Sequence, residues 1–196
     1  MKRLFDIVFS LSGLTVLSPF ILFLAILIKE EDGGSVFYRG VRVGRHGKPF
    51  RIFKFRTMVV NAENIGGPST ADDDPRITKI GKFIRKYKLD ELPQLINVLK
   101  GEMSFVGPRP QVEWAVDLYS QEEQEILKVR PGITDYASLR FSNEGEILRG
   151  STDPDKDYMQ KIHPEKMRLG LEYVRTRSFW GDIKIILQTI AVMFKH

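Results

Sequence analysis

The sequence predicts an α+β fold, in which an N-terminal membrane helix precedes one compact domain of amphipathic helices and a small β unit. Residues 7–28 form 22 consecutive positions without a charged side chain. Residues 50–56 alternate apolar with basic side chains, as strands do, and residues 79–89 repeat apolar side chains at helical spacing. A chain of 196 residues is long enough for one such domain and an appendage. We therefore divide it into residues 1–32 and residues 33–196.

The apolar segment is long enough to cross a bilayer, at about 1.5 Å of helix rise per residue. A secretory signal peptide fits poorly, because the charged residues 29–32 follow instead of a small-residue cleavage motif. Pro19 lies inside the segment, where it lacks a backbone donor and crowds the carbonyl group four residues earlier. The hydroxyl group of Ser18 can bond to a carbonyl group freed in this way.

Two interpretations of this segment follow from its proline. The arms on either side of Ser18 and Pro19, residues 7–17 and 20–28, have 11 and 9 residues, which are too few for either arm to cross alone. Basic residues lie at both ends of the segment, which suits a hairpin whose two ends share one face of the membrane. The segment is therefore either a kinked spanning helix or a helix that enters the membrane and returns.

Residues 33–58 are typical of a compact β unit. Two short β-type runs between residues 36 and 43 are separated by a glycine-rich turn from the alternating run at 50–56. Lys54 and Arg56 belong to the basic face of that run. This face is either solvated or presents the two cations to a phosphate group.

A polar loop and a basic helix come next. Residues 59–78 carry few apolar side chains and include three consecutive acidic residues, 72–74, which we interpret as part of a solvated loop rather than a cation site. Residues 79–89 predict a basic amphipathic helix. Its apolar face either packs on the core or lies on an anionic membrane surface.

Asp90 and Glu91 are an acidic pair in a strongly basic neighbourhood. One interpretation makes them the first turn of a helix, because Pro93 and an apolar run follow. The other makes them a nucleophile or metal ligands surrounded by phosphate-binding cations. Taken alone, the local sequence leaves both interpretations open.

The C-terminal half predicts mainly helices. We expect amphipathic helices over residues 111–128 and 158–177. A strongly apolar core or interfacial helix is expected over 179–194, because its apolar run is shorter than a membrane span. A turn at 130–134 leads into residues 135–141, which we expect to form a strand.

Charge and composition restrict the function further. Fifteen basic and seven acidic residues lie between positions 33 and 110, which predicts phosphates as partners: those of a nucleotide, a nucleic acid or a lipid headgroup. The chain has no cysteine and three widely separated histidines, so disulfides are excluded and a zinc site is disfavoured. Any metal is expected to be a hard cation held by carboxylates.

Three motifs, in order, resemble one protein family. Residues 37–58 read FYRGVRVGRHGKPFRIFKFRTM, residues 89–110 read LDELPQLINVLKGEMSFVGPRP, and residues 130–134 read RPGIT. Behind an apolar segment with Ser-Pro, they are similar in order and spacing to the bacterial sugar transferases, the small monotopic phosphoglycosyl transferases. The resemblance covers nearly the whole chain.

The resemblance implies a reaction and a topology. Members of this family move a sugar 1-phosphate from a nucleotide diphosphate sugar, usually a UDP-sugar, to polyprenyl (undecaprenyl) phosphate and release a nucleoside monophosphate such as UMP. This is the first membrane step of glycoconjugate biosynthesis. The resemblance also implies a re-entrant helix hairpin broken at Ser18 and Pro19, with residues 33–196 forming a membrane-associated domain on the cytoplasmic face.

The resemblance also implies roles for individual residues. Asp90 is expected to be the nucleophile that forms an acyl phosphosugar intermediate, and Glu91 belongs to the same catalytic dyad. Both carboxylates are the expected ligands of a Mg²⁺ cofactor. The expected phosphate-binding residues are Arg85, the Pro-Arg-Pro element at Pro108, Arg109 and Pro110, and the strand cations Lys54 and Arg56.

One stretch departs from the family. The family commonly continues Pro-Gly-Ile-Thr with Gly, a small or aromatic residue and then Ala-Gln-Val-Asn-Gly-Arg, whereas residues 135–141 read DYASLRF here. We assign no family role to Arg140, the basic residue of this stretch. The departure concerns sugar or base specificity rather than the reaction class.

The expected partners are a UDP-sugar, polyprenyl phosphate and membrane lipids, without nucleic acid. The oligomeric state stays open, a homodimer included, as does the identity of the sugar. Two other classes compete with a transferase. A membrane-tethered basic module would bind anionic lipid or nucleic acid without needing Asp90 and Glu91. A metal-dependent phosphohydrolase would release sugar phosphate to water without any lipid.

Overall fold

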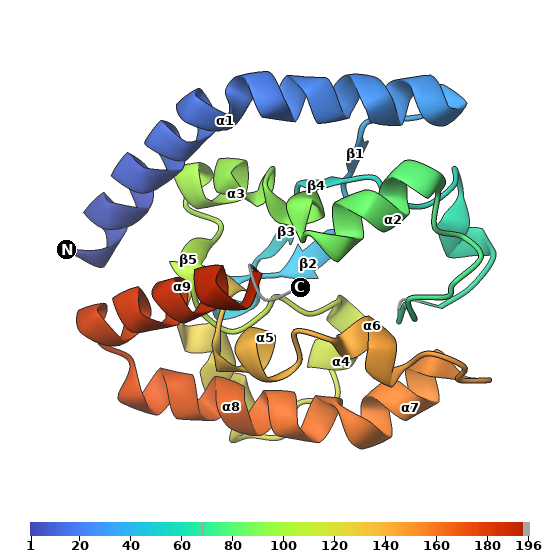
Figure 1. The fold of residues 1–196 in the computed structure, drawn as a ribbon. Coiled ribbons are helices and arrows are strands. Elements are labelled where there is room, and N and C mark those ends of the chain that lie inside the picture. Colours follow the sequence, from blue (N-terminus) through green and yellow to red (C-terminus); the bar gives the residue numbers. More distant parts are fainter. Residues whose placement is uncertain (68, 194–196) are drawn as a thin grey trace.

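A computed structural model describes residues 1–67 and 69–193 of the chain. Figure 1 shows helix α1, Lys2–Asp32, lying along one side of a body that contains the other helices and the short strands. The mixture of helices with a few strands confirms the predicted α+β class.

Helix α1 contains the predicted proline without being divided by it. Pro19 lies inside α1, and the Ser18 hydroxyl group donates to the carbonyl oxygen of Thr15, four residues before the proline, at 2.8 Å. This bond replaces the one that Pro19 cannot donate. Figure 1 shows that α1 bends between its two ends. The predicted hairpin of two arms is not confirmed, because the Ser18 bond keeps the helix continuous through the proline.

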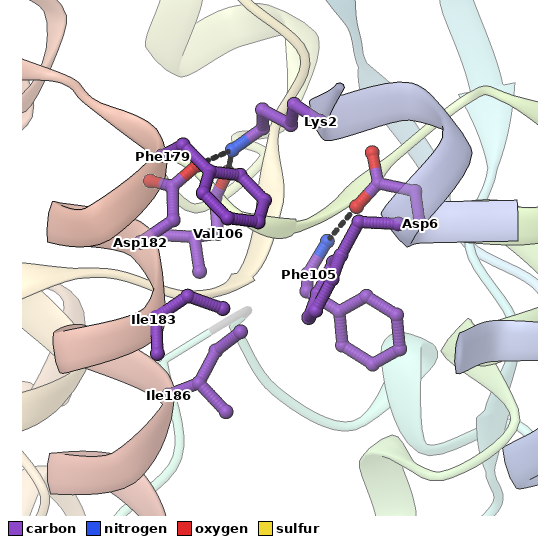
Figure 2. A pocket seen from close by; sticks show the side chains of 9 residues that line it. Lys2, Asp6, Phe105, Val106, Phe179, Asp182, Ile183 and Ile186 are labelled. Atoms are coloured by element: carbon purple, nitrogen blue, oxygen red, sulfur yellow. Dashed lines mark hydrogen bonds and ion pairs between the residues drawn. The ribbon is translucent and has the colours of Figure 1, made fainter. Parts of the chain in front are cut away.

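Charged side chains fix the N-terminal end of α1 to the body. Lys2 donates to the carbonyl oxygen of Val106 at 2.8 Å and forms an ion pair with Asp182 near the C-terminal end of the chain. Figure 2 shows this contact together with that of Asp6, whose carboxylate accepts from the backbone NH of Phe105 at 3.2 Å. The first turns of α1 are therefore held by specific polar contacts as well as by packing.

The C-terminal end of α1 is fixed to the same body. Leu24 and Ile28 are buried against Phe55 and Ile84 in one apolar cluster. Gly33 then ends the helix in the left-handed conformation, with φ 72°, which glycine adopts without steric cost. Both ends of α1 consequently contact one body.

The middle of α1 leaves its outer face uncovered. Val16 is 75% exposed and Leu22 is 62% exposed. Within residues 1–67 and 69–193, α1 is the one helix long and apolar enough to cross a membrane. A largely apolar surface of this kind, in which Ser12, Thr15 and Ser18 are the exposed polar side chains, is typical of contact with lipid.

Two antiparallel strand pairs follow α1 and confirm the predicted β unit. Strand β1, Phe37–Tyr38, pairs with β4, Lys54–Phe55. Between them, β2, Val41–Val43, pairs with β3, Pro49–Arg51, across a 3₁₀ turn (η1) at Arg45–Gly47.

A buried amide fixes this β unit to helix α3, Gln94–Lys100. Asn97 is fully buried; its Oδ1 accepts from the backbone NH of Phe53 at 2.8 Å, and its Nδ2 donates to the carbonyl oxygen of Arg51 at 3.0 Å. Both backbone groups lie just before β4. The Asn97 side chain therefore determines where Lys54, the first residue of β4, is placed relative to α3.

The predicted basic helix is α2, Lys79–Lys86. The hydroxyl oxygen of Thr78 accepts from the backbone NH of Gly81 at 2.9 Å and caps its N-terminus. The loop before it contains a 3₁₀ turn (η2) at Ala62–Asn64. This loop is not wholly solvated as predicted, because Asp74 forms a buried ion pair with Arg76 at 2.7 Å.

A parallel strand pair was missed in the sequence. Strand β5, Ser104–Val106, pairs with β6, Gly132–Thr134. The chains approach so closely here that a Cβ atom on Gly132 would lie 2.1 Å from the backbone nitrogen of Gly107. Glycine is required at this crossing.

The single helix predicted over residues 111–128 is wrong. Helix α4 spans Glu113–Val116, and a separate 3₁₀ helix, η4, spans Glu123–Lys128. A capping box starts the second piece: the Ser120 NH donates to the Glu123 carboxylate at 2.8 Å, and the Glu123 NH donates to the Ser120 hydroxyl group at 3.3 Å.

The strand predicted over residues 135–141 is also wrong, because helix α5 spans Tyr136–Arg140. The carboxylate of Asp135 accepts from the backbone NH of Ser138 at 2.7 Å. This N-cap stabilises the first turn of a helix in a stretch that otherwise reads as β-type.

Four more helices complete the described chain: α6, Glu144–Ile147; α7, Pro154–Lys161; α8, His163–Thr176; and α9, Phe179–Met193. Helices α7 and α8 replace the single helix predicted over 158–177, since Pro164 lies in the first turn of α8 and interrupts any longer helix. Helix α9 confirms the apolar helix predicted over 179–194, whose last residue lies outside the described residues.

Candidate active site

A tight turn carries the two predicted catalytic carboxylates. After α2, Lys88 adopts the left-handed conformation with φ 55° and ψ 23°, and a 3₁₀ turn (η3) follows at Leu89–Glu91. Asp90 and Glu91 both belong to η3, and α3 begins after Pro93. The helix-start interpretation is therefore partly right, because the acidic pair precedes a helix but occupies a turn of its own.

Two cations from distant segments converge on these carboxylates. The Nζ atom of Lys54 lies 2.8 Å from Oε1 of Glu91 and 3.3 Å from Oδ2 of Asp90. Nη2 of Arg109 lies 2.5 Å from the same Glu91 oxygen. The Asp90 side chain is 12% exposed and that of Glu91 15% exposed, so water screens these contacts only weakly. Four of the predicted site residues thus form one cluster.

The two cations keep Glu91 ionised. Burial on its own would raise the pKa of Glu91, but the charges and hydrogen bonds of Arg109 and Lys54 hold that pKa well below its usual range. Glu91 in turn raises the pKa of Arg109. A buried ion pair of this kind contributes little net stability, because desolvation offsets the attraction between its charges. Its chemical consequence is a fixed orientation of Lys54 and Arg109 beside Asp90.

The Pro-Arg-Pro turn is held by its neighbours in the sheet. The carbonyl oxygen of Pro108 accepts from the backbone NH of Gly132 at 3.1 Å, and that of Gln111, just after Pro110, accepts from Val43 at 2.9 Å. Both bonds tie the turn to strands. Pro108 and Pro110 thus restrict the backbone around Arg109 rather than supplying polar groups.

Lys88 and Arg85 lie beside the cluster. The side chain of Lys88 reaches solvent, yet enough protein surrounds its ammonium group to lower its pKa by burial. Glu91 and Asp90 act in the opposite direction, and the positive charges of Arg109 and Arg85 lower the Lys88 pKa further. Arg85, predicted to bind phosphate, is thus close enough to influence a residue at the dyad.

Arg56 is not brought to the cluster, so its predicted role in phosphate binding is not supported by its contacts. Its Nη2 atom lies 2.5 Å from Oδ1 of Asp32 at the end of α1, and its Nη1 atom donates to the carbonyl oxygen of Met58 at 3.2 Å. Arg56 therefore joins α1 to the β unit.

The carboxylate pair can supply part of the ligand set of a hard divalent cation. The described residues contain no group of three or more acidic, histidine or cysteine side chains that could hold a metal ion. Mg²⁺ is commonly held by one or two carboxylates, with water and substrate phosphates as its other ligands. Asp90 and Glu91 fit that pattern, and Asp90 is the less engaged of the two, because its contact with Lys54 is the longer one.

A second ion pair near Arg109 was missed in the sequence. Lys166 is 6% exposed and pairs with Glu144, and its ammonium group lies 4.9 Å from the ring centroid of Tyr158. Glu144 raises the pKa of Arg109, so the pair lies within electrostatic range of the dyad. Lys166 and Glu144 are 22 positions apart in the sequence, and no local sequence pattern predicted their contact.

The arrangement can perform one kind of chemistry well. A partly buried carboxylate, Asp90, lies beside Lys54, and Arg109 is held against the neighbouring Glu91. Such a setting lowers the repulsion that a carboxylate meets when it approaches a phosphate group, and it stabilises charge that develops on phosphate oxygens.

The sequence matches known proteins along its whole length. A family model described as bacterial sugar transferase matches residues 1–196. The exopolysaccharide production protein ExoY of Sinorhizobium fredii is 35% identical over 204 residues, which cover 96% of this chain and 83% of ExoY.

Longer relatives match as well. The undecaprenyl-phosphate galactose phosphotransferase of Salmonella typhimurium is 37% identical over 211 residues, covering 100% of this chain and 41% of the relative. The UDP-glucose:undecaprenyl-phosphate glucose-1-phosphate transferase of Escherichia coli is 38% identical over 193 residues, covering 97% of this chain and 39% of the relative. This chain thus spans about two fifths of the length of these two relatives.

Proposed function

Because the chain belongs to the bacterial sugar transferase family, we propose that it moves a sugar 1-phosphate from a UDP-sugar to polyprenyl phosphate and releases UMP. The observation that carries the proposal is Asp90 beside Glu91, with Lys54 and Arg109 held against both. Undecaprenyl phosphate is the acceptor that two relatives carry in their names. The reaction is then the first membrane step in the synthesis of a polysaccharide or another glycoconjugate.

In the first half-reaction, an oxygen of the Asp90 carboxylate attacks the phosphorus atom next to the sugar. A bond forms between that oxygen and phosphorus, and the bond from phosphorus to the bridging oxygen of the diphosphate breaks. The electron pair stays on the bridging oxygen, which leaves as part of UMP. The sugar phosphate is then joined to Asp90 as an acyl phosphate.

In the second half-reaction, an oxygen of polyprenyl phosphate attacks the same phosphorus atom. The acyl phosphate bond breaks, its electron pair returns to the Asp90 carboxylate, and polyprenyl diphosphate sugar leaves. A covalent intermediate lets one site serve a soluble donor and a membrane-bound acceptor in turn, which gives ping-pong kinetics.

The surrounding side chains supply electrostatic stabilisation. Lys54 and Arg109 bind developing charge on the phosphate oxygens, and Glu91 holds both cations in position. Asp90 and Glu91 would hold Mg²⁺, and the bound ion would supply further neutralisation of the negative charge on the diphosphate.

The attachment of α1 supports a re-entrant position in the membrane. A helix that crosses a bilayer carries its ends to opposite faces, whereas both ends of α1 contact one body through Lys2 and through Ile28. In this proposal the bend in α1 (Figure 1) lets the exposed middle of the helix enter one leaflet. The body stays at the cytoplasmic face, where UDP-sugars are available.

The test is a donor panel. The purified full chain in detergent is incubated with UDP-sugars, undecaprenyl phosphate and Mg²⁺, and UMP is measured. At least one donor is expected to yield UMP together with a lipid-linked sugar diphosphate, and EDTA is expected to stop the reaction until Mg²⁺ is restored. Absence of UMP with every donor would refute the transferase. Sugar phosphate released to water without lipid would instead identify a phosphohydrolase.

A further inference from the structure

We propose that Arg39 binds the phosphate group of an anionic phospholipid, at a site separate from the dyad. Arg39 follows strand β1 and has no part in the transfer reaction described above. Three observations carry the inference: the contacts of its guanidinium group, the face of the β unit on which it lies, and the charge of the segment that contains it. The inference goes beyond the proposed function and can be tested without turnover.

The guanidinium group of Arg39 is held in place without a polar partner. Its Cζ atom lies over the Phe53 ring, 3.3 Å from the ring centroid. Its Nε atom is buried and makes no hydrogen bond. Within residues 1–67 and 69–193 the guanidinium group forms no ion pair or hydrogen bond, and the side chain as a whole is only half-buried. A cation fixed in this way, with its donors unused, suits a ligand that supplies acceptors.

Arg39 lies on the face of the β unit that packs against α1. The Phe53 ring centroid is 5.9 Å from that of Phe37, and the Phe37 ring is stacked on Phe55 at 5.7 Å, so the three rings share one face. Phe37 and Phe55 belong to the cluster that buries the end of α1. Lys54 lies between Phe53 and Phe55 in the sequence and points to the other face, where it contacts the dyad. Arg39 is therefore outside the transfer site and on the side of the membrane helix.

The segment around Arg39 carries only positive charge. Residues 33–62 contain seven lysine and arginine side chains and no acidic one. Lys54 and Arg56 are the two of these that form ion pairs in the described part of the chain. Arg51 donates from Nη1 to the carbonyl oxygen of Arg39 at 3.3 Å, which brings a second unpaired guanidinium group close to the first. A bound anion would relieve the repulsion between these cations.

A phospholipid is the anion that fits this position. Lipid phosphates lie at the level where a helix leaves the hydrocarbon core, and basic sites beside membrane helices bind such headgroups. Arginine offers phosphate two parallel N–H···O bonds in a rigid fork. The acceptor, polyprenyl phosphate, has to bring its phosphate to Asp90 on the opposite face of the β unit. Inorganic phosphate lacks the apolar chains that would keep it beside α1.

Lipid binding to the full chain tests the assignment. The chain is purified in a nonionic detergent and titrated with phosphatidylglycerol or phosphatidylcholine, and bound lipids are counted by native mass spectrometry. The unaltered chain is expected to bind one phosphatidylglycerol more tightly than phosphatidylcholine. Arg39→Gln is expected to bind phosphatidylglycerol about 10-fold more weakly, and Arg39→Lys, which keeps the charge but loses the fork, about 3-fold more weakly.

The matched control is Lys48→Gln, which removes an exposed lysine from the same β unit and is expected to bind phosphatidylglycerol as the unaltered chain does. An equal loss of affinity in Lys48→Gln and Arg39→Gln would reveal a general effect of net charge and overturn the site. Unchanged binding in Arg39→Gln would overturn it as well.

A second measurement uses the unaltered chain, because Arg39→Gln also loses the contact with Phe53. A phosphatidylglycerol analogue with a diazirine next to its phosphate is expected, on illumination, to label a peptide within residues 37–54. Labelling confined to other segments would contradict the assignment.

Competition identifies the anion. Undecaprenyl phosphate is expected to bind equally well to Arg39→Gln and to the unaltered chain, because its phosphate goes to the dyad. If Arg39→Gln weakens undecaprenyl phosphate but not phosphatidylglycerol, Arg39 belongs to the acceptor site and the proposal fails. Displacement of phosphatidylglycerol by millimolar inorganic phosphate would likewise overturn it. A chain that binds phosphatidylglycerol through Arg39 but releases no UMP would refute the transferase and leave the lipid site standing.

Discussion

Glu91 is held ionised by its neighbours rather than by water. Lys54 and Arg109 both bind its Oε1 atom, at 2.8 Å and 2.5 Å. Removing one partner of a buried ion pair leaves the other charge buried without compensation, which is more costly than never having had the pair. Glu91 should therefore affect stability as well as activity.

We expect Glu91→Gln to destabilise the protein at pH 7 by roughly 1–3 kcal/mol. Lys54 and Arg109 then lose their shared carboxylate, and water screens Arg109 in part, because its side chain is 36% exposed. The pKa of Glu91 is lowered from its ordinary 4.5 in the folded state. Its ionised form therefore contributes stability above about pH 4.5, and this contribution is lost as the pH falls below that value. Thermal melts in detergent at several pH values are the measurement. The gap between variant and unaltered chain should narrow below pH 4.5.

The control is Glu125→Gln, which breaks an exposed pair between Glu125 and Lys128. Exposed pairs contribute about 0–1 kcal/mol, so this variant should melt almost like the unaltered chain at every pH. A Glu91→Gln variant as stable as the control at pH 7 would contradict the description of the site.

The site residues were predicted best where they lie close together along the sequence. Asp90, Glu91 and Arg109 lie in one motif-rich stretch, and Lys54 belongs to a strand with an obvious basic face. Arg56 belongs to the same basic face but binds Asp32, because the end of α1 comes close to the β unit only in the folded chain. Sequence periodicity cannot predict such a distant partner.

Among the helices and strands, helix α1 matters most for the position of the protein at a membrane. Its N-terminal end is held by Lys2 and Asp6, and its other end is buried at Leu24 and Ile28. The exposed segment between these two ends is the part of α1 that would enter a membrane. These attachments make a prediction about topology that does not depend on activity.

We expect both ends of α1 to be reached only from the cytoplasmic side. The chain has no cysteine, so a cysteine inserted before Lys2 and a Ser35→Cys variant each give a single labelling site. A membrane-impermeant maleimide should label both in inverted vesicles and neither in intact cells, since a re-entrant α1 returns to the face it left. Val16→Cys, in the exposed middle, should be labelled from neither side. Labelling of the two end positions from opposite sides would establish a spanning helix.

The elements that were predicted wrongly share a physical cause. Residues 111–128 and 135–141 were assigned from the periodicity of apolar side chains, but short-range capping determines both. Ser120 and Glu123 start one new helical piece, and Asp135 starts another. Both signals were readable in the sequence. The parallel pairing of β5 with β6 was not, because it joins short segments far apart in the chain.

At the scale of the whole molecule, the apolar surface and the charged cluster lie on different parts of the fold. Helix α1 offers an apolar surface, and the body presents a cluster of charge from η3, β4 and the turn after β5. Figure 1 shows α1 on the same side of the body as α3, the helix that follows the dyad. In the proposed reaction, this arrangement would bring a soluble, highly charged donor and an acceptor with a long apolar chain to one carboxylate.

The family and the general fold class followed from motifs spread along the whole chain. The sugar did not, because residues 135–141 depart from the family pattern. The buried pair of Glu144 and Lys166 was missed as well. Contacts of this kind depend on tertiary packing, and the sequence pattern carried no signal for them.

The central claim is that Asp90 carries the sugar phosphate, and mass spectrometry of the intact chain tests it most directly. The full chain is incubated with an active UDP-sugar and Mg²⁺ but without polyprenyl phosphate, and then quenched in acid. We expect one sugar phosphate to be added to the protein, at a peptide containing Asp90, with about one UMP released per chain. Asp90→Asn should show no added mass and a rate of UMP release lower by on the order of 10³-fold or more. Release of UMP only when the lipid acceptor is present, with no mass added to the chain, would contradict the claim and indicate direct transfer.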